Sequence, residues 1–259
     1  MKELGLYIHI PFCKQKCLYC DFYSMSASEE LIDRYFNALI KEIKDVGQNV
    51  KDTIIKTIYI GGGTPSYVNC RYIIQTMQTI RDFFSISEEA EITIEVNPGS
   101  ASLEKLKNYI ESGINRISIG MQSINNNTLK TIGRIHTWED FKHTYNFARE
   151  AGFKNINIDC MTGLPNQNMQ EIEETAKEII KLSPEHVSVY SLIIEENTQL
   201  EKLVSSGQIK LPEENEEREM YWYIKQALEE NGYNQYEISN FSKPNYESKH
   251  NLDCWHQKE

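Results

Sequence analysis

An alternation of short apolar strands with helical segments constrains the fold of this chain more than any other feature. Strand-like apolar runs stand at residues 4–10, 55–61, 91–96, 115–120, 155–160 and 186–192. Between them, apolar residues recur with helical spacing over about 29–46, 69–84, 102–112, 137–151 and 168–181. Gly113 and Gly152 stand where C-terminal helix caps belong. This rhythm predicts an α/β fold with a parallel sheet, either open and doubly wound or curled into a partial barrel.

Polar or small residues follow the carboxyl end of each predicted strand. In strand order they are Cys13, Cys17 and Cys20; Gly61, Gly62, Gly63 and Thr64; Glu95 and Asn97; Gln122 and Ser123; Asp159; and Ser191. Ligand sites of parallel α/β sheets lie at this edge. Local hydrogen bonding explains any one of these residues about equally well. The whole set beside three cysteines predicts a single site.

The stretch "CKQKCLYC" places Cys13, Cys17 and Cys20 in a Cys-x3-Cys-x2-Cys spacing. No apolar leader precedes it and no apolar run is long enough to span a bilayer, so we expect a cytoplasmic protein in a reducing compartment. A structural zinc ion needs four ligands, and no clear fourth lies nearby, because His9 is better interpreted as a core or rim residue of its strand. A four-iron cluster held by three thiolates instead leaves one iron open for a ligand.

Composition excludes several other classes. The 259 residues are 40% hydrophobic and 25% charged, values typical of a globular chain. A net charge of −11 gives no general surface for nucleic acid, although a local basic pocket could hold a small anion. Of the other cysteines, Cys70 and Cys160 are predicted to be buried apolar residues.

The motif "CKQKCLYC" resembles the cluster motif of the radical S-adenosylmethionine (SAM) superfamily. The stretches "YIHIPFC", "GGGTPS", "EVNPG", "RISIGMQSIN", "GRIH", "NIDCMTGLPNQ", "YSLIIE" and "YEISNF" resemble the oxygen-independent coproporphyrinogen III oxidase-like family, especially its HemW-type heme chaperone branch. The resemblance implies a partial (β/α)6 barrel of parallel strands over residues 1–195. Residues 196–259 would then begin a C-terminal extension packed on the barrel, and family members continue further, so we expect a C-terminal truncation.

The resemblance also implies the residues of the site. Cys13, Cys17 and Cys20 would hold a [4Fe-4S] cluster. S-adenosylmethionine would contact Tyr7, Tyr19, Gly62, Gly63, Thr64, Glu95, Gln122, Arg134 and Asp159. The glycines let the backbone approach a charged ligand. The carboxylates of Glu95 and Asp159 can accept hydrogen bonds from ribose hydroxyls or offset the charge of a sulfonium. The planar guanidinium of Arg134 can bind a carboxylate of the cofactor or of a tetrapyrrole through two hydrogen bonds.

Two branches of the family have different functions, and one sequence position distinguishes them. The oxidase has a fourth cysteine two residues after the third, whereas this chain has Phe22. The chain therefore resembles the chaperone branch, which implies heme as bound cargo, recipient (respiratory) hemoproteins and an electron donor as partners. The sequence leaves open whether the protein forms a homodimer and whether it associates peripherally with a membrane. The alternatives are an oxygen-independent coproporphyrinogen III oxidase and a purely structural iron-sulfur protein.

The C-terminal stretch supplies a heme ligand candidate and one more helix. The element "HNLDCW" contains His250, our predicted axial ligand, and Cys254, a competing thiolate ligand. The stretch "EENEEREMYWYIKQALEENGY" predicts an amphipathic helix whose apolar face carries Met220, Tyr223, Ile224, Ala227 and Leu228.

Overall fold

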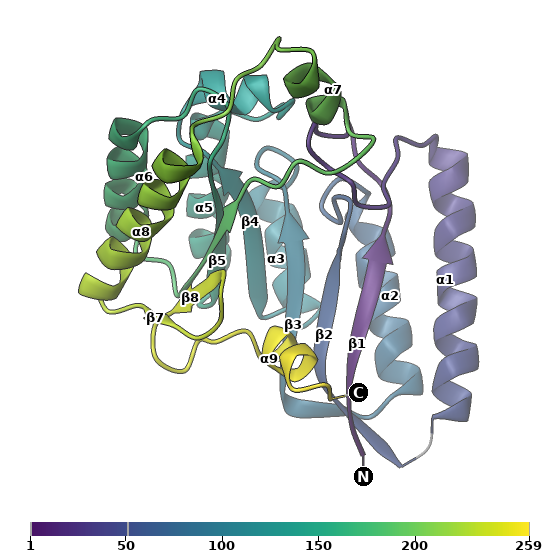
Figure 1. Ribbon diagram of the computed structural model, residues 1–259. Helices are drawn as coiled ribbons and strands as arrows, with labels where there is room; N and C mark the ends of the chain where they lie inside the picture. The colour runs from purple at the N-terminus through teal and green to yellow at the C-terminus, as the bar shows by residue number, and fades with distance from the viewer. Residues whose placement is uncertain (1, 51, 259) are drawn as a thin grey trace.

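Six parallel strands lie side by side in sequence order and form one curved sheet (Figure 1). The structure, a computed structural model, describes residues 2–50 and 52–258. The strands are β1 Lys2–Ile10, β2 Thr53–Gly62, β3 Ile86–Val96, β4 Arg116–Gln122, β5 Ile156–Thr162 and β6 His186–Ser191. Because the order never reverses, all crossovers run in one direction and place their helices on one face. This confirms the partial barrel and excludes the doubly wound sheet.

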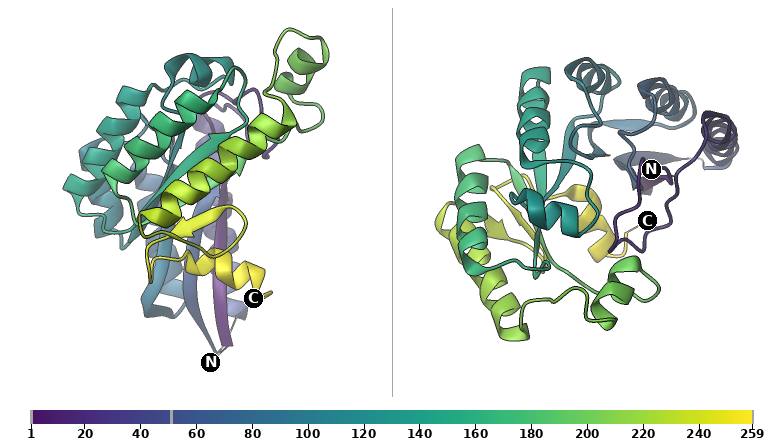
Figure 2. Two further views of the ribbon diagram at one scale, coloured as in Figure 1. Left: turned by 60° about the vertical axis from the view of Figure 1, so that its left-hand side comes forward. Right: turned by 90° about the horizontal axis from the view of Figure 1, so that it is seen from above.

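Five helices follow the first five strands and cover the outer face of the sheet, as Figure 2 shows from above. They are α1 Glu29–Asn49, α2 Cys70–Phe83, α3 Leu103–Glu111, α5 Trp138–Ala151 and α6 Met169–Leu182, close to the predicted ranges. Each begins after a residue whose side chain accepts a backbone N–H of the first turn, namely Ser28, Asn69, Ser102, Thr137 and Asn168. Gly152 caps α5 in the left-handed conformation, as predicted.

The remaining elements extend the barrel wall or lie at its two ends (Figure 1). They are α4 Asn126–Thr131, α7 Gln199–Ser205, α8 Glu214–Glu230, β7 Asn234–Gln235, β8 Asn240–Ser242 and α9 Lys249–Trp255. Strand β8 pairs antiparallel with β6, and β7 pairs with β8. The predicted amphipathic helix is α8, which buries Met220, Ile224 and Leu228 and packs beside α6. Helix α9 lies against β2, in front of the sheet in Figure 1.

The strands are apolar toward the helices and polar toward the barrel interior. Ile58 and Ile60 of β2, like Ile94 of β3, belong to one buried core between sheet and helices. The alternate positions face inward and carry Thr57, Tyr59, Thr93, Glu95, Arg116, Ser118, Asn157, Asp159, His186 and Ser188. The fold therefore supplies a polar interior on a rigid apolar scaffold.

Two further expectations have a structural outcome. Cys160 is buried in the core, as predicted, whereas Cys70 at the start of α2 is half-buried. Over residues 2–50 and 52–258, no helix combines the length and apolar character needed to cross a membrane.

Candidate functional site

A cavity of about 330 Å³ opens at the carboxyl ends of the parallel strands. Eleven of the thirteen predicted site residues line it: Cys13, Cys17, Tyr19, Cys20, Gly62, Gly63, Thr64, Glu95, Gln122, Arg134 and Asp159. They come from the ends of β1 to β5 and from the loops that follow. This volume lies within the usual range for small-molecule and cofactor sites.

The cysteines stand on a loop that leaves β1 and returns to it. Met25 anchors the loop, since its backbone N–H donates to Pro11 O at 2.8 Å and its carbonyl accepts the Cys13 N–H at 3.0 Å. Cys13 is buried, Cys17 and Cys20 are half-buried, and all three thiols are free. The loop thus directs three thiols into one cavity.

The three thiols fit a polynuclear cluster better than a single ion. Within the part of the chain that the structure describes, no three His, Cys, Asp or Glu side chains converge to hold one metal ion. A four-iron cluster does not need such convergence, because each thiolate binds a different iron. Burial raises the pKa of Cys20, and the nearby Cys17 and Cys13 thiols raise it further. Iron would reverse this effect, because metal coordination deprotonates a thiol.

The glycine run at the end of β2 packs directly against the cysteine loop. Gly62 has a φ of +113°, and an added Cβ there would lie 2.6 Å from the His9 ring. At Gly63, an added Cβ would lie 2.9 Å from Phe12 O and 3.0 Å from Cys13 Sγ. The lack of side chains is therefore needed for close approach of the cysteine loop as well as for the open cavity.

Two carboxylates give the cavity an acidic wall. Glu95 accepts the Tyr59 hydroxyl at 2.9 Å and the Gly62 N–H at 3.0 Å. Asp159 accepts the Ser118 hydroxyl at 3.1 Å and the Asn157 amide at 2.7 Å. Burial raises the pKa of both carboxyls, that of Glu95 to about 7. A cationic ligand in this cavity would stabilise their ionised forms.

Arg134 puts a positive charge on the opposite wall, beside the cysteines. Its Nη1 lies 3.7 Å from Cys17 Sγ, and no Asp or Glu contacts its guanidinium among residues 2–50 and 52–258. Although burial alone would lower it, the pKa of Arg134 is raised by the neighbouring Tyr19 and Cys17 side chains. A buried guanidinium without a carboxylate partner needs another anion nearby. A cluster held by three thiolates is anionic overall and satisfies that need.

Gln122 reaches the cavity because the end of β4 is irregular. The β4–β5 register shifts between Gly120 and Gln122, and Gln122 adopts a φ of +65°. Such a conformation is unfavourable for a non-glycine residue and is often found at functional sites. The sequence alone carried no sign of this bulge.

Two predicted residues lie outside the cavity. Tyr7 is half-exposed on the inner face of β1, where it stacks beside Tyr59 with ring centroids 6.2 Å apart. His250 lies on α9 and stacks on the same Tyr59 ring with ring centroids 5.3 Å apart. Its Nδ1 contacts Thr57 Oγ1 at 2.8 Å. Its competitor Cys254 is exposed on the same helix. Tyr59 therefore lies between the cavity and α9.

Sequence reasoning missed several residues that line the cavity. They are Tyr59, Ser118 and Tyr190, which occupy inward-facing strand positions. Strict alternation in "IYIG", "RISIG" and "HVSVYS" was the available signal. Parallel strands covered on both faces are usually apolar throughout, so polar residues at every second position indicate a polar interior.

Comparison with known proteins finds similar sequences over nearly the whole chain. A sequence profile described as the radical SAM superfamily matches residues 7–179. The chain is 41% identical over 250 residues to the heme chaperone HemW of Bacillus subtilis, covering 96% of this chain and 66% of that protein. It is 40% identical to heme chaperone HemW of Lactococcus lactis, covering 100% and 67%. The chain thus spans about two thirds of the length of these relatives.

Solved structures show the same architecture. The Escherichia coli coproporphyrinogen III oxidase HemN, described as a radical SAM enzyme, superposes with a TM-score of 0.85 at 28% identity, over 98% of this chain and 58% of that one. The archaeal Elp3 of Methanocaldococcus infernus superposes with a TM-score of 0.56 at 19% identity, over 87% and 54%, which is a likeness of fold alone.

Proposed function

Because the chain belongs to the radical SAM superfamily and, within it, to the HemW family, we propose that it binds heme and delivers it to recipient, respiratory hemoproteins. A [4Fe-4S] cluster and S-adenosylmethionine are the cofactors of the superfamily. In this proposal, Cys13, Cys17 and Cys20 hold the cluster, and the remaining cavity residues hold S-adenosylmethionine.

The observation that carries the chaperone assignment is Phe22. It lies at the cavity rim two residues after Cys20, is 65% exposed, and occupies the position of the fourth cysteine of the oxidase motif. A phenyl ring can neither bind iron nor move a proton. The cavity therefore contains the residues proposed to bind the cluster and S-adenosylmethionine, but lacks the fourth cysteine of the oxidase motif.

The geometry of His250 supports its role as a heme ligand. The Thr57 contact engages Nδ1, which leaves Nε2 as the nitrogen for iron. Metal-binding histidines commonly have their second nitrogen held by a neighbour in this way. Burial lowers the pKa of His250, so the imidazole is neutral at physiological pH, as an iron ligand must be.

The side chains of the cavity have separate tasks in this proposal. When bound, the cluster supplies an electron that cleaves a carbon–sulfur bond of S-adenosylmethionine. Glu95 and Asp159 would supply negative charge for the sulfonium and ammonium groups. The Gly62–Thr64 backbone would let those groups approach closely, and Tyr19 would shield the cluster from water.

The competing function is coproporphyrinogen oxidation. It is favoured by the close structural likeness to HemN and by a cavity lined by eleven of the thirteen predicted site residues. An oxidase would consume coproporphyrinogen and cleave S-adenosylmethionine when reduced. A chaperone would bind heme tightly without consuming a porphyrinogen. A structural iron-sulfur protein would do neither.

One anaerobic experiment separates the three. Reconstituted protein is reduced in the presence of S-adenosylmethionine, and 5′-deoxyadenosine and loss of coproporphyrinogen are assayed. Heme is titrated in parallel into wild type, His250→Ala, Cys254→Ser and the matched control His256→Ala, which removes an exposed histidine from the end of the same helix. Heme binding weakened by His250→Ala alone, without porphyrinogen loss, supports the chaperone. Decarboxylation with heme binding indifferent to His250 supports the oxidase.

The remaining expectations belong to the same proposal. Residues 1–195 would form the radical SAM core and residues 196–259 a C-terminal extension. The protein would work in the cytoplasm, take electrons from a donor protein and bind no nucleic acid. A homodimer and peripheral membrane association would be measured by light scattering and by vesicle sedimentation.

A further inference from the structure

A path of polar side chains joins two of the three cluster cysteines. Cys13 Sγ lies 3.4 Å from Thr64 Oγ1, which in turn lies 2.8 Å from Asn97 Nδ2. Asn97 Oδ1 lies 3.0 Å from Arg134 Nη2, and Arg134 Nη1 lies 3.7 Å from Cys17 Sγ. The path therefore begins at one sulfur and ends at another.

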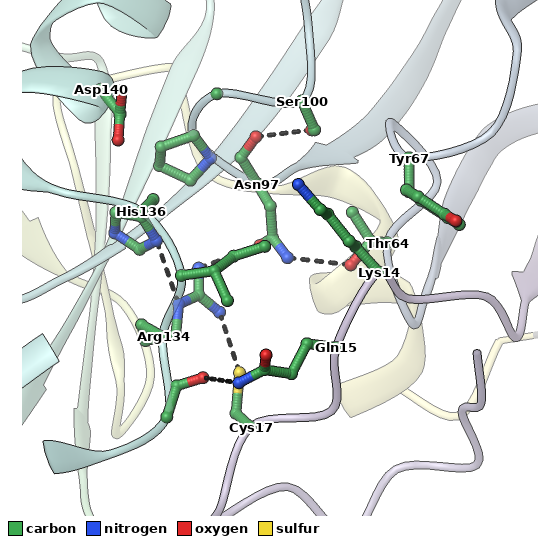
Figure 3. Close-up of a pocket in the computed structure, with 14 residues that line it drawn as sticks. Lys14, Gln15, Cys17, Thr64, Tyr67, Asn97, Ser100, Arg134, His136 and Asp140 are labelled. Carbon is green, nitrogen blue, oxygen red and sulfur yellow. Dashed lines mark hydrogen bonds between the residues drawn. The ribbon is translucent and has the colours of Figure 1, made fainter. Parts of the chain in front are cut away.

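This path forms a wall between two cavities. Cys17, Thr64, Asn97 and Arg134 line both the cofactor cavity and a second cavity of about 310 Å³, which Figure 3 shows. The figure shows the guanidinium of Arg134 turned toward Cys17 and the Asn97 amide between Arg134 and Thr64. Cys13, by contrast, lines the cofactor cavity and not the second one.

The chemistry of arginine fixes the direction of the hydrogen bonds on either side of Asn97. A guanidinium has only donors, so the Asn97 atom facing Arg134 must be the carbonyl oxygen. The Asn97 amide nitrogen must then face Thr64 and donate to its oxygen. Because that oxygen accepts, the single hydroxyl hydrogen of Thr64 is free to donate to Cys13 Sγ. A thiolate bound to iron has no hydrogen of its own, so in the cluster-bound state both sulfurs would accept a hydrogen bond.

His136 fixes the far side of the guanidinium by the same logic. Arg134 Nε donates to His136 Nδ1 at 3.2 Å, so the ring hydrogen is on Nε2, which donates to Met121 O at 3.2 Å. Arg134 Nη2 also donates to Gly120 O at 2.9 Å. Every guanidinium nitrogen thus has a partner within the protein. Burial lowers the pKa of His136 to about 3, which keeps the ring neutral and this tautomer available.

We propose that Thr64 and Arg134 donate hydrogen bonds to the Cys13 and Cys17 sulfurs of the bound cluster, and that Asn97 and His136 are positioning residues that aim these donors. The inference rests on the proposed cluster site and deepens it. Donors to cluster sulfurs stabilise the more negative, reduced cluster and so raise its reduction potential. In this proposal Arg134 contacts the cluster as well as S-adenosylmethionine.

The first test is an EPR-monitored redox titration of the anaerobically reconstituted full chain. Thr64→Val keeps the shape of the side chain and removes the donor, and His136→Leu removes the acceptor that holds Arg134. Both substitutions should shift the midpoint potential to more negative values, whereas Thr64→Ser and His136→Gln should stay near wild type. An unchanged potential in Thr64→Val or His136→Leu, with the cluster intact, would overturn the proposal.

A double-mutant comparison tests the positioning role of Asn97. In Asn97→Asp the carboxylate accepts from Arg134 and from Thr64, so the Thr64 hydroxyl hydrogen turns away from Cys13. Thr64→Val should then cause little further shift in the Asn97→Asp background. If Thr64→Val shifts the potential equally in both backgrounds, Asn97 does not aim the hydroxyl.

A measurement on the metal-free protein tests the role of His136 even if the His136→Leu variant does not assemble the cluster. In the metal-free full chain, ¹⁵N NMR should show an arginine Nε–H signal protected from solvent exchange, assigned by its loss in Arg134→Lys. The protection should disappear in His136→Leu and persist in His136→Gln, and its persistence in His136→Leu would overturn the His136 role. A wild-type chain that assembles no cluster would instead refute the proposed function itself.

Discussion

The Tyr59 hydroxyl donates a hydrogen bond to Glu95 Oε1 at 2.9 Å on the inner face of the barrel. The second carboxylate oxygen accepts the Gly62 N–H at 3.0 Å. Both bonds favour the ionised carboxylate, but burial, together with repulsion from Asp159, outweighs them and raises the pKa of Glu95 to about 7. Glu95 therefore changes its charge near neutral pH in the cofactor-free protein.

This pKa predicts a pH dependence of stability. Between its usual pKa of 4.5 and the folded value of about 7, the folded state holds the proton that the unfolded state has lost. Stability from Glu95 is thus fully present below pH 4.5 and is lost as the pH rises to 7. Urea unfolding of the cluster-free protein should show a steeper fall from pH 5 to 7 in wild type than in Glu95→Gln. Parallel curves for the two proteins would contradict the prediction.

The fold could be predicted because its determinants are local. Period-two apolar strands, helical spacing and caps such as Ser28 and Gly152 act within a few residues of sequence. Strand ends of a parallel sheet meet at one edge whatever the loops do, so Glu95 and Asp159 could be assigned to one site before the structure was known.

The rest of the site depends on contacts that sequence spacing does not encode. Thr57 and His250 are separated by 193 positions, and only the packing of α9 across the barrel interior brings them together. Asn97 was noted at a strand end, but its link between Thr64 and Arg134 follows from how three loops stack. Tyr7 faces the interior, as strand alternation predicts, and pairs in register with Tyr59, yet of the two only Tyr59 lines the cavity.

Removal of one cluster cysteine should abolish the cluster. In Cys17→Ala we expect loss of cluster iron and of its visible absorbance after anaerobic reconstitution, since two thiolates cannot replace three. Cys70→Ser is the matched control, because Cys70 is half-buried at the start of α2 and outside the cavity. Iron content in Cys17→Ala equal to that of the control would refute the cluster assignment.

Gly63→Ala should damage the cluster site through packing alone. The added methyl would lie 2.9 Å from Phe12 O and 3.0 Å from Cys13 Sγ, so the cysteine loop must shift. Overpacking of this kind costs about 1–3 kcal/mol of unfolding free energy. Gly207→Ala is the comparison, because its methyl meets nothing within 4 Å, although a φ of +73° strains it. Both variants should lose stability in urea unfolding, but only Gly63→Ala should lose bound iron.

Glu91 should hold α9 against the barrel interior. Its buried carboxylate accepts the backbone N–H groups of Lys249 at 3.1 Å and His250 at 3.2 Å, and the Ser248 hydroxyl at 3.4 Å. Glu91→Leu leaves these donors without a partner, at a cost of about 1–3 kcal/mol. Because α9 buries no residue of its own, that loss should detach it.

Hydrogen exchange measured by mass spectrometry tests this anchor. Amides of residues 248–255 should lose protection in Glu91→Leu, while those of β2 and β3 should keep theirs. Glu89→Leu is the matched control, since Glu89 lies on the same strand and offers α9 only a backbone carbonyl, to the Lys249 ammonium. If His250 binds heme from its place against Thr57, heme affinity should fall in Glu91→Leu and not in Glu89→Leu. Unchanged protection of residues 248–255 would show that Tyr59 and Thr57 hold α9 without Glu91.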